Sequence, residues 1–93
     1  MAFHLLASLN SNTLANCLAS IGSSDSLLLL GDGVYVLQSP QLLAACRAAT
    51  GNIYVLAVDQ QQRLPNTGVS VPLISNAEWV EMSLSLGPVV SWY

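Results

Sequence analysis

Charge is the feature that this 93-residue chain has least of, because only 8% of its residues are charged, against about 25% in a typical domain. Its only basic side chains, Arg47 and Arg63, cannot build a surface that follows nucleic acid phosphates, so direct nucleic-acid binding is not expected. A small domain with so few charged side chains leaves much apolar surface exposed to solvent. We therefore expect other subunits to cover part of it in an oligomer.

Long apolar runs, cysteine frameworks and a targeting segment are also missing. No apolar run approaches the ~20 residues that span a bilayer, and the first residues lack the basic start and cleavage site of a signal peptide. These absences predict a cytoplasmic protein without membrane association. The two cysteines, Cys17 and Cys46, are too few for a disulfide scaffold or a metal cluster, so both are expected to be thiols and neither metal nor cofactor is expected.

Apolar side chains make up 53% of the chain, and the most informative of them form the run Leu27–Leu30 before Gly31-Asp32-Gly33. Four leucines without alternation predict a strand covered on both faces, as in a parallel sheet flanked by helices. In open α/β folds, function gathers at the carboxyl edge where such a strand ends. The length fits one domain over residues 1–93.

The rest of the pattern alternates between strands and helices. Strands are predicted over 3–8, 27–30, 53–58, 69–74 and 89–93, and helices over 40–49 and 76–86, with short helical turns over 34–37 and 59–63. A further helix carries Leu14, Cys17, Leu18 and Ile21 on one apolar stripe and ends at Gly22. Pro72 makes the fourth strand an edge or irregular strand. The fold class is α/β, with a three-layer, mostly parallel sheet of about five strands in a flavodoxin-like arrangement.

Helix boundaries carry local signals of their own. Ser39 precedes Pro40 as an N-cap followed by proline at the first helical position. Ser75 and Glu78 have the spacing of a capping box, in which the hydroxyl and the carboxylate each accept a backbone N–H. In the helix that follows, Trp79, Val80 and Met82 are expected to face the core.

Few side chains are candidates for chemistry. Cys17 is the one plausible sulfur carrier, but its place on the apolar stripe favours core packing, and Cys46 also fits packing better than chemistry. His4 is expected to be a hydrogen-bonded core residue, and Asp32 to bond the backbone of its turn. Asp59 and Arg63 are expected to form an i, i+4 ion pair. Trp92 and Tyr93 are expected to be either an anchor onto the hydrophobic core or an interface patch, and the low charge favours the interface patch.

Four segments, in order across almost the whole chain, resemble the DsrH/TusB family of small sulfur-relay subunits, within the DsrE-like fold group. The segments are Phe3-His4-Leu5-Leu6, the run from Leu27 to Asp32-Gly33-Val34-Tyr35, Tyr54-Val55-Leu56 with Asp59 and Arg63, and Ser91-Trp92-Tyr93. The resemblance implies a cytoplasmic subunit of a heterohexamer, a dimer of heterotrimers with TusC/DsrF-like and TusD/DsrE-like partners.

Two functional branches follow from the resemblance. In the TusBCD branch the complex passes persulfide sulfur towards 2-thiolation of the tRNA wobble uridine, and in the DsrEFH branch it serves sulfur oxidation. The principal sulfur-carrying cysteine of both lies on the TusD/DsrE-like partner. DsrH members carry a cysteine on their first helix, where Cys17 stands here, so Cys17 is the candidate persulfide carrier of this chain. A small-ligand-binding module at the Gly31-Asp32-Gly33 corner is the alternative from another class.

Overall fold

The computed structural model describes residues 1–93 and contains one five-stranded sheet. All neighbouring strands are parallel, in the order β4-β3-β2-β1-β5. The strands are β1 (Phe3–Leu6), β2 (Ser26–Leu29), β3 (Asn52–Leu56), β4 (Leu73–Ile74) and β5 (Val89–Trp92). The central strand is therefore β2, with β1 and β3 on either side of it, and the last strand, β5, forms one edge of the sheet.

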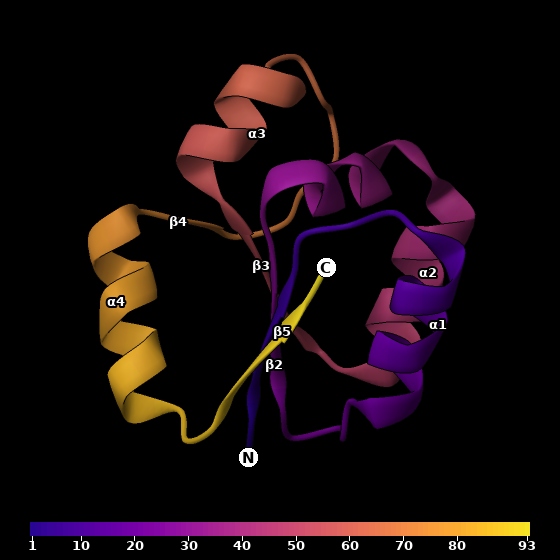
Figure 1. Ribbon diagram of the computed structural model, residues 1–93. Helices are drawn as coiled ribbons and strands as arrows, with labels where there is room; N and C mark the ends of the chain where they lie inside the picture. Colours follow the sequence, from indigo (N-terminus) through magenta and orange to yellow (C-terminus); the bar gives the residue numbers. More distant parts are fainter.

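Helices cover the two faces of the sheet unequally. On one side lie α1 (Ser11–Ser20) and α2 (Pro40–Ala49), and on the other lies α4 (Asn76–Ser85) alone (Figure 1). At the carboxyl ends of the strands lie α3 (Ala57–Arg63) and the 3-10 helix η1 (Gly31–Gln38). The three-layer α/β arrangement predicted from the sequence is confirmed, with a sheet that is parallel throughout. None of these helices combines the length and the apolarity needed to cross a bilayer.

The helix starts are where the local signals placed them. Asn10 caps α1 by accepting the backbone N–H groups of Asn12 and Thr13, and Ser39 caps α2 ahead of Pro40. The capping box of α4 is complete, because Ser75 Oγ accepts from the Glu78 N–H and the Glu78 carboxylate accepts from the Ser75 N–H. Each cap satisfies donors that the first helical turn would otherwise leave free.

The leucine run of β2 is buried on both sides, as predicted. Leu27 and Leu29 belong to the larger core cluster under α1 and α2, whereas Leu28 belongs to the smaller cluster under α4. The α4 side holds 5 buried apolar residues and the other side 13, so a single helix leaves the α4 face of the sheet thinly covered.

Four predictions about these elements are wrong. The first strand, predicted over 3–8, ends at Leu6. The strand predicted over 69–74 is reduced to Leu73–Ile74, because Pro72 has no N–H to donate and the preceding residues run as coil. The strand predicted over 53–58 ends at Leu56, since α3 begins at Ala57 with Asp59 in its first turn. Val80, expected in the core, is 59% exposed, while its neighbours Trp79 and Met82 pack against the α4-side cluster.

Candidate functional site

The Gly31-Asp32-Gly33 corner lies at the carboxyl edge of the sheet, and its two glycines contact other parts of the protein. Gly31 adopts a positive φ of 53°, and its N–H donates to Asp59 Oδ2 at 2.7 Å. A Cβ at Gly33 would overlap the carbonyl oxygen of Leu6, so only glycine fits where η1 passes over β1. The corner therefore fastens η1 to β1 and α3, and none of the four surface grooves is lined by its residues.

Two predictions about the charged residues at this edge are wrong. Asp59 does not pair with Arg63, because its carboxylate holds the Gly31 backbone. Arg63 Nε instead lies 3.7 Å from Asp32 Oδ1, in a solvent-exposed ion pair, and Asp32 makes no hydrogen bond to its own turn. An exposed pair of this kind contributes little stability, about 0–1 kcal/mol.

Both cysteines are packing residues in this conformation. Cys17 on α1 and Cys46 on α2 are completely buried in the core cluster between these helices and the sheet. Burial, with a smaller contribution from the neighbouring Cys46, raises the pKa of the Cys17 thiol to about 12, and burial raises that of Cys46 to about 11. Neither thiol lines a surface groove. Near neutral pH both are protonated and out of reach of a sulfur donor.

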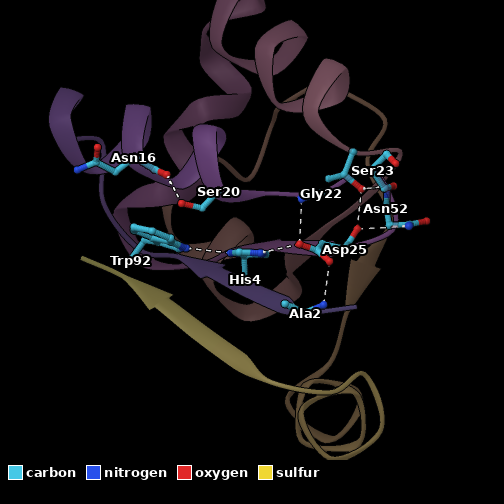
Figure 2. Close-up of polar contacts among 10 residues, drawn as sticks. Ala2, His4, Asn16, Ser20, Gly22, Ser23, Asp25, Asn52 and Trp92 are labelled. Carbon is cyan, nitrogen blue, oxygen red and sulfur yellow. Dashed lines mark hydrogen bonds and ion pairs between the residues drawn. The ribbon is translucent and has the colours of Figure 1, made fainter.

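His4 forms the centre of a hydrogen-bond chain that joins three distant parts of the sequence (Figure 2). The Trp92 indole N–H donates to His4 Nδ1 at 3.0 Å, and His4 Nε2 lies 3.0 Å from Asp25 Oδ2. Because an indole N–H can only donate, Nδ1 must be the acceptor and the imidazole proton lies on Nε2, where it donates to the carboxylate. His4 is thus the hydrogen-bonded core residue that the sequence predicts.

Asp25 fixes the other end of this chain. Its carboxylate accepts the backbone N–H groups of Gly22 at 2.9 Å and Ala2 at 2.8 Å, besides the His4 imidazole. These contacts, with the Gly22 N–H first, lower the pKa of Asp25 to about 2. The chain from Trp92 to Asp25 consequently ties β5 to β1 and to the loop before β2. Trp92 is half-buried and packs on the core, as in the core-anchor role that the sequence leaves open, whereas Tyr93 is 80% exposed.

Sequence reasoning missed Asp25 and the contact of Asp59 with Gly31. Asp25 lies in a polar loop whose sequence indicates only a turn, and two of its three partners, His4 and Ala2, lie 21 and 23 residues away. Asp59 could have been found, because β2 and β3 are neighbours and residues that follow parallel strands meet at one edge.

Two shallow grooves are the largest hollows in the surface. One, of about 600 Å³, is lined by Leu37, Pro40, Leu43, Ala44, Arg47, Val69 and Ser70, and its one charge, Arg47, donates to the Ser70 carbonyl. The other, of about 330 Å³, is almost wholly apolar and lies between α4 and β5. No three His, Cys, Asp or Glu side chains gather in a way that could hold a metal ion. These two grooves thus offer mainly apolar contact areas.

Comparison with known proteins places the chain in a family. The fold is similar to the solution NMR structure of protein Tm0979 from Thermotoga maritima, with 21% identity and a TM-score of 0.57 over 88% of this chain and 90% of that one. No functionally curated protein matches the chain. The family model described as DsrH like protein matches residues 7–87. That span includes both cysteines, the Gly31-Asp32-Gly33 corner and α4, and the chain accordingly belongs to the DsrH-like family of sulfur-relay subunits.

Proposed function

We propose that this chain is an assembly subunit of a cytoplasmic sulfurtransferase complex, most like TusB in 2-thiolation of the tRNA wobble uridine. Its partners would be TusC/DsrF-like and TusD/DsrE-like subunits in a heterohexamer, with the principal sulfur-carrying cysteine on the TusD/DsrE-like partner. The observation that carries the proposal is the complete burial of both Cys17 and Cys46.

The chemistry of sulfur relay explains why the burial of the two cysteines matters. In each transfer an acceptor thiolate attacks the terminal sulfur of a donor persulfide, a new S–S bond forms, the donor S–S bond breaks, and the donor leaves as a thiolate. The acceptor must therefore be both deprotonated and accessible. Cys17 and Cys46 are neither in this conformation, so the chain supports the transfer by building the complex rather than by holding the sulfur.

The surface supports a role in assembly. With 8% charged residues the chain leaves several large apolar side chains in contact with solvent, including Leu73 at 52% and Leu84 at 85% exposure. Contact areas between subunits that associate permanently are apolar in this way. We therefore expect the chain to bind both partner types.

Genetic replacement tests the proposal. Cells that lack the chain should lose 2-thiouridine at the wobble position of tRNA, and the wild-type chain should restore it. Cys17→Ser and Cys46→Ser should restore it as well, because neither thiol carries sulfur in this account. Co-purification of each variant with both partners is the control for assembly. The proposal fails if the chain remains monomeric when both partners are co-expressed with it, or if its loss leaves the 2-thiouridine content unchanged.

A second candidate is a DsrH-like subunit of a sulfur oxidation complex, with a transient persulfide on Cys17. The favouring observation is the position of Cys17 on the first helix of a DsrH-like chain. It requires α1 and α2 to separate far enough to expose the thiol. The distinguishing result would be a Cys17→Ser chain that assembles normally but fails to support transfer. The small-ligand module at the Gly31-Asp32-Gly33 corner is less well supported, because Asp59 already occupies the Gly31 N–H.

A further inference from the structure

The imidazole of His4 is a buried titratable group that has no part in the proposed function. His4 lies on β1, is 3% exposed and is the only histidine of the chain. Imidazole is the side chain that ordinarily gains or loses its charge between about pH 5 and pH 8. A change of protonation at His4 therefore alters contacts inside the fold rather than on its surface.

The two ring nitrogens of His4 have neighbours with opposite requirements (Figure 2). On one side, the Trp92 indole N–H donates to Nδ1 at 3.0 Å, and this contact requires a lone pair on Nδ1. The planes of the two rings differ by 16°, so the indole N–H can point along that in-plane lone pair. On the other side, Nε2 lies 3.0 Å from Asp25 Oδ2, and a carboxylate at this distance favours a positive charge on the imidazole.

Asp25 remains a carboxylate over the whole range in which an imidazole titrates. Its contacts, with the Gly22 N–H first, lower the pKa of Asp25 to about 2. Because Nε2 already carries a proton, a second proton taken up from solvent goes to Nδ1 and turns the contact of His4 with Asp25 into an ion pair. The same proton removes the acceptor of the Trp92 indole and sets two N–H donors against each other. Protonation of His4 thus strengthens one of its contacts and breaks the other.

Asp25 is the charged side chain beside His4, because the neighbouring elements carry none. The elements that pack most closely against β1 are α1, β2 and β5, and none of them contains Asp, Glu, Lys or Arg. Their titratable groups are the buried thiol of Cys17 on α1 and, just beyond β5, the phenol of Tyr93, which is 80% exposed. The α-amino group of Met1 belongs to a residue that is 73% exposed. The contacts of His4 with Asp25 and with the indole therefore determine what its protonation does.

The contact that protonation breaks fastens the end of an edge strand. β5 has β1 as its one neighbour in the sheet, and none of its four side chains is completely buried. Trp92 is the side chain of β5 that packs against the larger core cluster. Without the indole contact, the end of the strand is held by the Ala7 N–H, which donates to the Trp92 carbonyl at 3.0 Å, and by the Thr13 hydroxyl, which donates to the Tyr93 carbonyl at 2.9 Å. Loss of the side-chain contact should therefore loosen this end of β5.

We propose that His4 is a pH-sensitive switch for β5: neutral His4 holds the Trp92 indole, and a second proton on His4 releases the indole and loosens the end of the strand. In the neutral state Nδ1 accepts from the indole and Nε2 donates to Asp25. In the protonated state the imidazolium pairs with Asp25 and the indole N–H turns to solvent. Coupling between two equilibria is reciprocal, so protonation weakens the indole contact by the factor by which that contact opposes protonation, about 2–10-fold for one hydrogen bond.

NMR of the purified full chain over a pH series tests this inference. The nitrogen shifts of His4 show when Nδ1 takes up its proton, and hydrogen exchange of the Trp92 indole N–H and of the Ala7 amide shows the state of β5. Both protection factors, referred to the intrinsic exchange rate at each pH, should fall about 2–10-fold at the midpoint of the second protonation. The Trp79 indole N–H, which makes no hydrogen bond to the protein, is the internal control and should not follow this midpoint. The measurement needs neither a partner nor a sulfur donor, so its outcome is independent of the proposed function.

Trp92→Phe tests the same coupling from the other side. Without the indole, protonation of Nδ1 breaks no hydrogen bond, so the pH midpoint of the second protonation should rise by about 0.5–1 pH unit. Trp79→Phe removes an indole that has no contact with His4 in Figure 2 and should leave the midpoint unchanged. The inference is overturned if the Trp92 indole and the Ala7 amide keep their protection once Nδ1 is protonated, or if Trp92→Phe leaves the midpoint where it is in the wild type. It is also overturned if His4 stays neutral until the chain unfolds.

Discussion

Replacing Trp92 by phenylalanine tests the hydrogen-bond chain that fastens the last strand to the sheet. The change removes the indole N–H and leaves His4 Nδ1 without a donor in a residue that is 3% exposed. An unsatisfied buried acceptor costs about 1–3 kcal/mol. Trp79→Phe is the matched control, because Trp79 is also half-buried but its indole N–H makes no hydrogen bond to the protein. The control therefore accounts for the lost ring area alone.

Urea unfolding followed by circular dichroism gives the free energy of unfolding of each variant. Trp92→Phe should lose about 2 kcal/mol more than Trp79→Phe, with a range of about 1–3 kcal/mol. For a domain of this size that difference corresponds to about 8–16 °C in Tm. Nitrogen NMR of His4 in the wild type should show the proton on Nε2. The reasoning is refuted if the two variants differ by less than about 0.5 kcal/mol, or if the proton is found on Nδ1.

Three further predictions concern stability. Because the pKa of Asp25 is lowered from 3.8 to about 2 in the folded chain, its contribution is complete above about pH 4 and is lost as the pH falls towards 2; the unfolding free energy measured against pH should show this loss in the wild type but not in Asp25→Asn. Gly33→Ala should lower the free energy of unfolding by about 3 kcal/mol or more, because the added Cβ meets the Leu6 carbonyl. Gly51→Ala should leave it almost unchanged, because no atom lies within 4 Å of the added Cβ. Equal denaturation midpoints for the two variants would contradict this account. Leu28→Ala, in a completely buried position, should cost about 2–5 kcal/mol in urea unfolding, and a cost below that range would show that the α4 side collapses around the gap.

The fold could be predicted from local signals. The unbroken apolar run of β2 indicates a strand covered on both faces, and Ser39-Pro40 and the pair Ser75 and Glu78 mark helix starts by chemistry that acts within three residues. The strand predicted over 69–74 is confirmed only at Leu73–Ile74, because β-branched residues favour a strand only where the backbone also pairs, and Pro72 has no N–H to donate.

The site was less predictable because its hydrogen bonds join residues that are far apart in the sequence. The Trp92 to His4 hydrogen bond spans 88 residues, and nothing local to either residue indicates the other. The apolar stripe of α1 did predict Cys17 as a buried residue, but the same pattern is compatible with a cysteine at a family-specific position. The choice between packing and chemistry thus needed the three-dimensional environment of the thiol.

The mass of each subunit after sulfur loading tests the central claim most directly. The complex of this chain with its TusC/DsrF-like and TusD/DsrE-like partners would be exposed to a persulfide-loaded donor, and the intact mass of every subunit would be measured. We predict an added sulfur atom on the TusD/DsrE-like subunit and no added mass on this chain, because both of its thiols are buried and protonated. An added sulfur on this chain that disappears in Cys17→Ser would contradict the account and make Cys17 a carrier.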